Sequence, residues 1–140
     1  MVDKATLKTF DDSLQRCNAN PRFLDRFYET FLASSPLVRE KFANTDFVRQ
    51  KRALRASLQT MALVAEDEVA GPGKYLKDLA RTHSREGMNI GGELYDDWLD
   101  SLLATLKECD PAFSPEVGKA WESVMMVGVH YLMSSYNNPH

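Results

Sequence analysis

The spacing of apolar residues constrains the fold of this chain most strongly, because these residues recur at helical intervals along nearly its whole length. In one clear stretch Leu24, Phe27 and Phe31 fall on a single face of a helix. No segment alternates apolar and polar residues at every second position, which is the pattern of a half-buried strand. The pattern therefore predicts an all-α fold without strands.

Proline, glycine and asparagine divide this pattern into seven or eight helices of very different length. We place Pro21 in the first turn of the second helix, a strong break at Gly71-Pro72-Gly73, and a helix stop at Gly87. The expected helices cover 6–17, 21–33, a short segment around 37–42, 47–66, 74–85, a long segment from 93 to 109, and a last helix that opens at Ser114-Pro115. Such mixed lengths favour pairwise crossing of helices over a simple four-helix bundle.

Length and charge limit the possible functions. The chain has 140 residues, which predicts one domain over 1–140 with a core large enough to hold a cofactor. Its 17 Lys and Arg against 20 Asp and Glu leave no broad cationic surface, so we expect no nucleic-acid partner. No apolar run approaches the roughly 20 residues of a membrane span, and the first residues lack a hydrophobic signal core. We expect a cytoplasmic protein with no membrane partner.

The two cysteines, Cys17 and Cys109, match neither a metal-binding spacing nor the CxxCH pattern of covalent haem attachment. We expect both to be reduced thiols, as is usual in the cytosol.

Three polar residues, Tyr28, Gln50 and His83, occupy positions where the helical pattern calls for apolar ones. A buried polar group without a partner costs roughly 1–3 kcal/mol, so each needs a reason to be there. Since the three lie on three different predicted helices, they indicate a shared polar spot inside an apolar cavity.

His83 falls on the same helical stripe as Leu76 and Leu79. Taken alone, a histidine on an apolar face is more often a hydrogen-bonded core residue than a ligand, and no second His or Cys lies at the spacing of a zinc site. One imidazole is enough for haem, because the porphyrin supplies four further ligands. In that case one ring nitrogen would bind iron, and the other N–H would bond a backbone carbonyl one turn earlier.

With these residues in place, the chain resembles the bacterial haemoglobins and the globin domain of flavohaemoglobins. The resemblance covers essentially the whole chain and rests on the order and spacing of several short pieces. These are Phe27-Tyr28 with Phe31, Ser35-Pro36, Phe42, Gln50 with Ala53-Leu54, Leu79-Ala80, His83, Tyr95, the run 102–106, and Ala120-Trp121. It implies the globin fold around a non-covalent haem b.

The resemblance implies a role for each matching residue. His83 would be the proximal iron ligand, Phe42 would stack on the haem, and Tyr95 would lie on the proximal side near His83. Tyr28 and Gln50 would line the distal side, with Leu54 as its wall. Further haem contacts are expected from Phe27, Leu79, Met88, Ile90, Leu99 and Met125. Arg49, Arg52 or Arg55 could pair with the haem propionates, or could form an ordinary solvated helix face.

This chain departs from the family pattern at three places. The segment between Phe42 and Gln50 is shorter, so Leu54 competes with Gln50 for the distal position. The segment between His83 and Tyr95 is longer. No acid occupies residues 133–138, where the family carries a proximal glutamate. We therefore expect a neutral proximal histidine, suited to gas binding more than to breaking O–O bonds.

The function implied is reversible binding of O2, and of NO or CO, at a His-ligated iron, with Tyr28 as hydrogen-bond donor. Oxygen binding or storage and oxidation of NO to nitrate share this chemistry, and electrons would come from a separate reductase. The alternatives are a gas sensor that acts on a signalling partner in trans, and a globin-fold protein without haem. A monomer and a homodimer are both compatible with the sequence.

Overall fold

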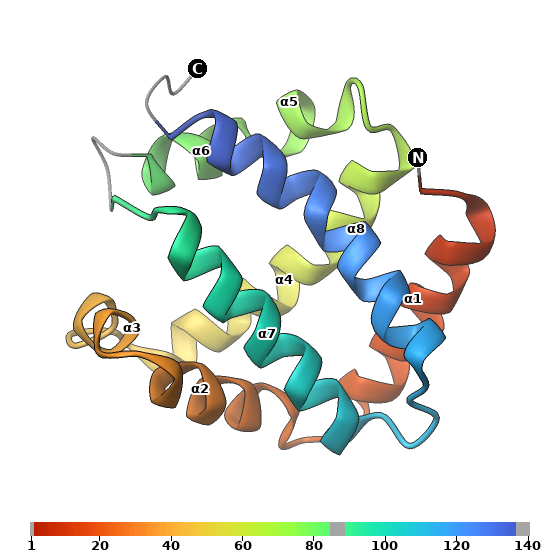
Figure 1. Cartoon of the computed structure of the whole chain (residues 1–140), viewed down its shortest axis with the longest axis horizontal. Helices are drawn as coiled ribbons and strands as arrows, with labels where there is room; N and C mark the ends of the chain where they lie inside the picture. Colours follow the sequence, from red (N-terminus) through yellow and green to blue (C-terminus); the bar gives the residue numbers. More distant parts are fainter. Residues whose placement is uncertain (1, 85–88, 137–140) are drawn as a thin grey trace.

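A computed structural model describes residues 2–84 and 89–136 of the chain. This part forms eight α-helices and no strand, so the all-α prediction is confirmed (Figure 1). The helices are α1 (Lys4–Asn18), α2 (Phe23–Ser34), α3 (Pro36–Lys41), α4 (Phe47–Glu66), α5 (Gly71–Tyr75), α6 (Lys77–His83), α7 (Gly92–Cys109) and α8 (Pro115–Ser134).

Side-chain caps begin several helices where the sequence predicts them. The carboxylate of Asp46 accepts from the N–H groups of Val48 and Arg49 at the start of α4. Ser114 accepts from the N–H of Val117 and is followed by a proline at the start of α8. These bonds satisfy backbone donors that have no partner within the helix, so the predicted starts of α4 and α8 are confirmed.

Two predicted helix boundaries are wrong. Pro21 does not lie in the first turn of α2, because Asn20 accepts from the N–H groups of both Arg22 and Phe23 and holds the chain in a turn there. The single helix predicted over 74–85 is divided at Leu76, whose backbone leaves helical geometry at φ −113° and ψ 3°. The side chain of Leu76 is buried in the core at this bend.

The glycine–proline segment also differs from expectation. Gly71-Pro72-Gly73 is not a break between helices but forms the start of α5. The turn that separates α4 from α5 comes before it, at 67–70. At the other end α6 stops at His83, and the stop predicted at Gly87 lies outside the described residues.

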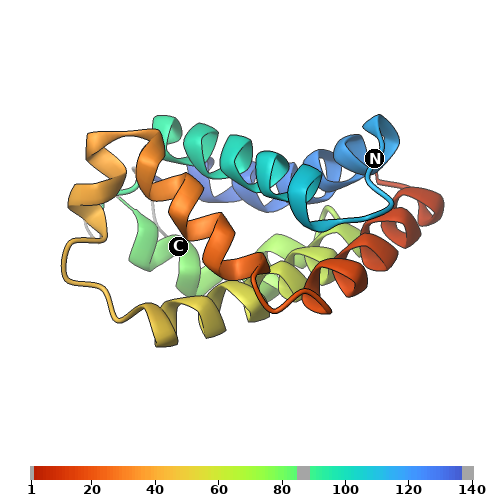
Figure 2. The same cartoon turned by 90° about the horizontal axis from the view of Figure 1, so that it is seen from below.

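The helices pack in crossing pairs. α7 and α8 lie side by side, α2 packs on α7, α1 packs on α8, and α4 crosses behind α8 (Figures 1 and 2). α4 and α6 each pack on α5 and α8, but they do not pack closely on each other. In Figure 1, α6 lies at the upper left, far from α2 and α3 at the lower left. The candidate residues predicted on α2 and on α6 therefore belong to helices that do not pack closely on each other.

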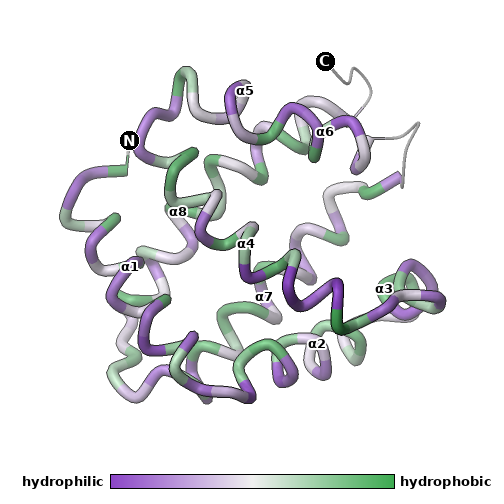
Figure 3. Tube along the Cα trace, turned by 180° about the vertical axis from the view of Figure 1, so that it is seen from behind, coloured by the Kyte–Doolittle hydropathy of each residue, from purple (hydrophilic) through white to green (hydrophobic). Residues whose placement is uncertain are grey.

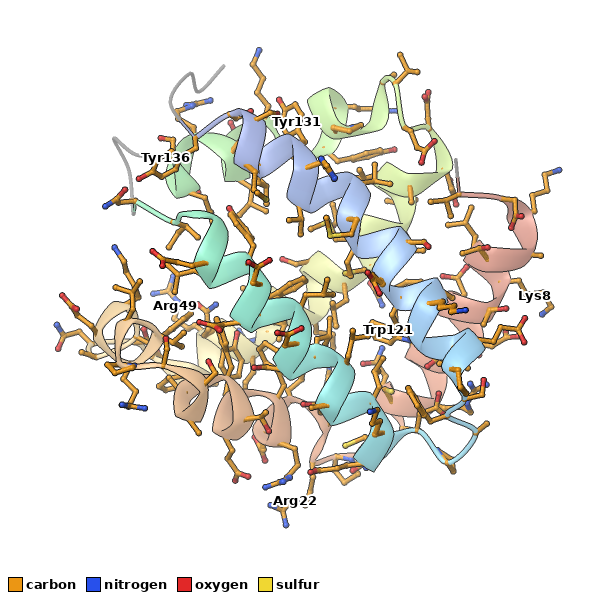
Figure 4. The ribbon with its side chains drawn as sticks, viewed as in Figure 1. Lys8, Arg22, Arg49, Trp121, Tyr131 and Tyr136 are labelled. Atoms are coloured by element: carbon orange, nitrogen blue, oxygen red, sulfur yellow. The ribbon has the colours of Figure 1, made fainter. Side chains whose placement is uncertain are left out.

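A polar network holds the other end together. The Trp121 side chain is fully buried, and its ring meets Phe10 edge-on at 4.6 Å (Figure 4). Its indole Nε1 donates to Ser13 Oγ at 2.9 Å, and Ser13 donates to Asp110 at 2.6 Å. Arg16 makes two further hydrogen bonds to the same buried carboxylate, at 2.6 and 2.9 Å. α1, α7 and α8 are thus joined away from the candidate site.

Cys17 and Cys109 are both free and buried. Burial raises the pKa of the Cys17 thiol to about 12, so it is protonated at neutral pH. Within 2–84 and 89–136, no helix is long and apolar enough to cross a membrane.

Candidate functional site

The Tyr28 side chain of α2 is buried in an aromatic cluster. Its ring lies edge-on to Phe27 at 5.0 Å, to Phe47 at 5.4 Å and to Phe42 at 6.0 Å. Burial raises the pKa of its hydroxyl to about 12, although the contact with Gln50 acts in the opposite direction. The hydroxyl therefore keeps its proton at neutral pH and can act as a hydrogen-bond donor.

The only acceptor for this hydroxyl among the described residues is distant. Tyr28 Oη lies 3.5 Å from the backbone carbonyl oxygen of Gln50, whereas O–H···O bonds are usually near 2.7–2.8 Å. The donor is therefore weakly engaged and remains available to a better acceptor.

Gln50 and Leu54 lie one turn apart on α4. Gln50 is half-buried, and Leu54 is 6% exposed. The contact with Tyr28 brings the Gln50 backbone to the edge of the aromatic cluster. The Tyr28 hydroxyl and the Gln50 backbone thus meet between α2 and α4, and Leu54 follows one turn later on α4.

His83 is half-buried in the last turn of α6. Its Nδ1 lies 3.0 Å from the carbonyl oxygen of Leu79, one turn earlier, and 3.2 Å from Thr82 Oγ1. Since a carbonyl oxygen only accepts, Nδ1 carries the proton and Nε2 keeps its lone pair. The predicted backbone hydrogen bond is confirmed.

Burial sets the charge of His83. Removal from water lowers the pKa of its imidazole below the usual value, and the bond to Leu79 opposes this only in part. The ring is therefore neutral at pH 7, the form in which imidazole binds a metal. Within the described residues, no carboxylate hydrogen-bonds His83.

Tyr95, in the first turn of α7, is 8% exposed and has no hydrogen-bond partner for its hydroxyl among the described residues. Burial raises the pKa of this hydroxyl, so it stays protonated. The nitrogen Nδ1 of His83 is bonded to Leu79 and Thr82, so the structure contains no Tyr95–His83 hydrogen bond through that atom. An unpartnered buried hydroxyl is costly and marks a place where a ligand group could bond.

The remaining predicted contact residues lie as follows. Phe42 is half-buried and its ring stacks with Phe47 at 6.3 Å. Phe27 and Met125 are fully buried, while Leu79, Ile90 and Leu99 are partly buried and pack against the core. Met88 lies outside the described residues.

Two residues of this site are missing from the sequence prediction. The ring of Phe47 closes the aromatic cluster around Tyr28, and its position three residues before Gln50 is the signal that could have identified it. Thr82 contacts Nδ1 of His83 and also donates to the Leu79 carbonyl at 3.0 Å. Nothing in the sequence around Thr82 identifies it as a residue of this site.

Comparison with known proteins decides the family. A model of the globin family matches residues 25–132. This chain belongs to the globin family. A crystal structure of the protein PA3967 from Pseudomonas aeruginosa PAO1, described as structurally highly homologous to a human hemoglobin, matches this globin with a TM-score of 0.90. The two are 38% identical, and the match covers 95% of this chain and 99% of that one. No curated protein sequence matches.

Globins typically bind haem, and the residues of this globin fit that group. His83 offers a neutral imidazole with a free Nε2, held by a backbone bond. Tyr28 has a weakly engaged hydroxyl, and Tyr95 has an unpartnered one. In the described part of this globin, no group of three or more His, Cys, Asp or Glu is placed to hold a metal ion. A single imidazole is a suitable donor set for haem iron and a poor one for a free metal ion.

Proposed function

We propose that this globin binds haem b non-covalently through His83 and reversibly takes up a diatomic gas, chiefly O2, with Tyr28 as the distal donor. When bound, haem supplies an iron atom with a free position for O2, NO or CO. The observation that carries this proposal is the hydrogen bond from His83 Nδ1 to the Leu79 carbonyl. It orients the ring and leaves Nε2 as the free donor, which is the usual arrangement of a metal-binding histidine.

Tyr28 would set the ligand preference. Its hydroxyl is protonated and lies among Phe27, Phe42 and Phe47, which keep water away. A donor in such a dry site acts strongly on negative charge that develops on a bound gas. Since O2 draws more electron density than CO, the donor favours O2. Gln50, at the edge of the same cluster, would offer a second donor from its side-chain amide.

The proximal side supports reversible binding over O–O bond cleavage. The partner of His83 is a backbone carbonyl, and no carboxylate bonds it within residues 2–84 and 89–136. A neutral carbonyl gives the ring less anionic character than a carboxylate would. We therefore propose a carrier or store of gas. A monomeric or homodimeric state and a cytoplasmic location remain predictions from the sequence.

Titration of the purified chain with haemin tests the proposal. We expect one haem per chain, a sharp Soret band, and distinct ferric, ferrous and ferrous-CO spectra. A chain that takes up no haem would refute the proposal and leave a globin fold with another use. NO consumption under O2, measured with and without an added reductase, distinguishes a dioxygenase from a carrier. A signalling protein that binds only the gas-loaded form would instead indicate a sensor.

A further inference from the structure

Three arginines along the outer side of α4 stand apart from the others. Arg49, Arg52 and Arg55, here called the α4 basic stripe, are exposed, and none of their guanidinium groups has a partner among the described residues. The other described arginines all pair with a carboxylate or donate to a backbone carbonyl; they are Arg16, Arg22, Arg26, Arg39 and Arg81. The stripe is therefore free to pair with carboxylates of another molecule.

The sequence of α4 concentrates this positive charge. No acidic residue occurs between Phe47 and Ala65, while Lys51 adds a fourth cation that pairs with Asp25. Figure 3 shows α4 from its outer side, where hydrophilic residues (purple) and hydrophobic residues (green) are interspersed along the helix. In the view of Figure 4, Arg49 lies between α3 and the start of α7.

α4 also carries residues of the candidate site. Its opposite side carries Gln50 and the buried Leu54. A helix with its side chains is about 10 Å across, so a molecule bound to the stripe lies roughly that far from the site. Such a distance suits the passage of an electron between two proteins.

A second charged stripe lies on α7. Glu93, Asp96, Asp97 and Asp100 recur at helical spacing on one face, and none of them has an ion pair within the described residues. α4 crosses behind α7 in Figure 1, and Figure 2 shows α7 and α4 on opposite sides of the molecule. The chain, with a net charge of −3, is therefore polarised, and its field would steer an acidic partner toward α4 and away from α7.

We propose that the α4 basic stripe is the docking surface for an acidic one-electron donor protein that keeps the haem iron ferrous. This inference rests on the proposed function, since O2 binding requires ferrous iron. The donor loses one electron and the ferric iron gains it, with no bond made or broken. Three unpaired arginines are enough to bind a small acidic protein surface. A nucleic acid is less suitable as the partner, because the acidic residues of α7 would repel its phosphate backbone.

Stopped-flow reduction of the haem-loaded ferric globin by a reduced, acidic [2Fe–2S] ferredoxin tests the proposal. The variant Arg49→Gln/Arg52→Gln/Arg55→Gln removes the stripe, and Asp96→Asn/Asp97→Asn/Asp100→Asn on α7 is the matched control. At low ionic strength we expect the stripe variant to react about tenfold more slowly than the parent and to lose most of its salt dependence. We expect the α7 variant to react as fast as the parent or faster.

Three results would overturn the proposal. Equal rates for the parent and the stripe variant would mean that the donor docks elsewhere. Faster haem loss from the stripe variant to an apomyoglobin trap would assign these arginines to the haem propionates. Salt-sensitive self-association that either triple variant abolishes would make a second copy of this chain the occupant.

Failure of the proposed function is detected separately. A chain without a Soret band cannot report electron transfer. Calorimetric binding of the same ferredoxin to the parent and to both variants then tests the docking surface alone. Salt-sensitive binding that only the stripe variant loses supports the surface, and equal binding by all three contradicts it.

Discussion

The hydroxyl of Tyr28 lies 3.5 Å from the carbonyl oxygen of Gln50, too far for a strong hydrogen bond. The ring is fixed by its aromatic neighbours, so the hydroxyl is held in place although it makes no strong hydrogen bond. Such preorganisation costs the protein little when a better acceptor arrives.

Replacement Tyr28→Phe should therefore accelerate O2 dissociation. The ring and its packing remain, and one charge-assisted hydrogen bond worth about 1.5 kcal/mol is lost, which corresponds to a factor of about ten. Flash photolysis with stopped-flow mixing measures the rate. CO dissociation is the internal control and should change much less. Unchanged O2 dissociation would remove Tyr28 from the distal role.

The network around Asp110 should govern stability without affecting the site. Asp110→Asn keeps the shape but weakens the bonds from Ser13 and Arg16. Because the carboxylate is buried while Arg16 is partly exposed, we expect a loss of about 2–3 kcal/mol. Urea unfolding measures it, and Asp12→Asn, in an exposed pair with Lys8, should cost less than about 0.5 kcal/mol. Equal losses would show that burial does not matter here.

The Asp110 carboxylate should also make the free energy of unfolding depend on pH in the acid range. Burial alone would raise the pKa of Asp110, but hydrogen bonds from Arg16, Ser13 and the Ala112 N–H outweigh it and hold the pKa below the usual value. A lowered folded-state pKa contributes stability above the unfolded value near 3.8, and this contribution disappears as pH falls through the folded value. The difference in unfolding free energy between the parent and Asp110→Asn should shrink below about pH 4. A difference that stays constant would contradict this assignment.

Close packing at the α4–α5 junction predicts a contrast between two glycines. A Cβ on Gly71 would lie 2.5 Å from the carbonyl oxygen of Val64, a backbone atom that cannot move aside, whereas a Cβ on Gly73 would meet nothing within 4 Å. Gly71→Ala should cost about 1–3 kcal/mol, and Gly73→Ala should be neutral or stabilising by about 0.5 kcal/mol. Thermal unfolding compares them; a harmless Gly71→Ala would show that the junction is loosely packed.

Local chemistry explains why some elements could be predicted from the sequence. The bounds of α4 follow from the cap at Asp46 and an uninterrupted apolar stripe, and the start of α8 follows from Ser114-Pro115. The break at Leu76 gives no such signal, because this buried residue continues the apolar stripe of the predicted helix.

In the candidate site, too, some contacts could be predicted from the sequence and others could not. The hydrogen bond of His83 to Leu79 could be predicted, because it joins residues four apart on one helix. The acceptor of Tyr28 could not, since it is a backbone atom of another helix and depends on how α2 and α4 cross. The unpartnered hydroxyl of Tyr95 is likewise a property of the packed structure.

Ligation of the haem iron by His83 is tested with the variant His83→Gly. We expect this variant to lose haem or to show a strongly altered ferrous-CO spectrum, and added imidazole to restore the parent spectrum by filling the vacated space. His130→Gly, at an exposed position of α8, is the matched control and should leave the spectrum unchanged. A His83→Gly protein with normal haem affinity and an unaltered spectrum without imidazole would show that His83 is not the iron ligand.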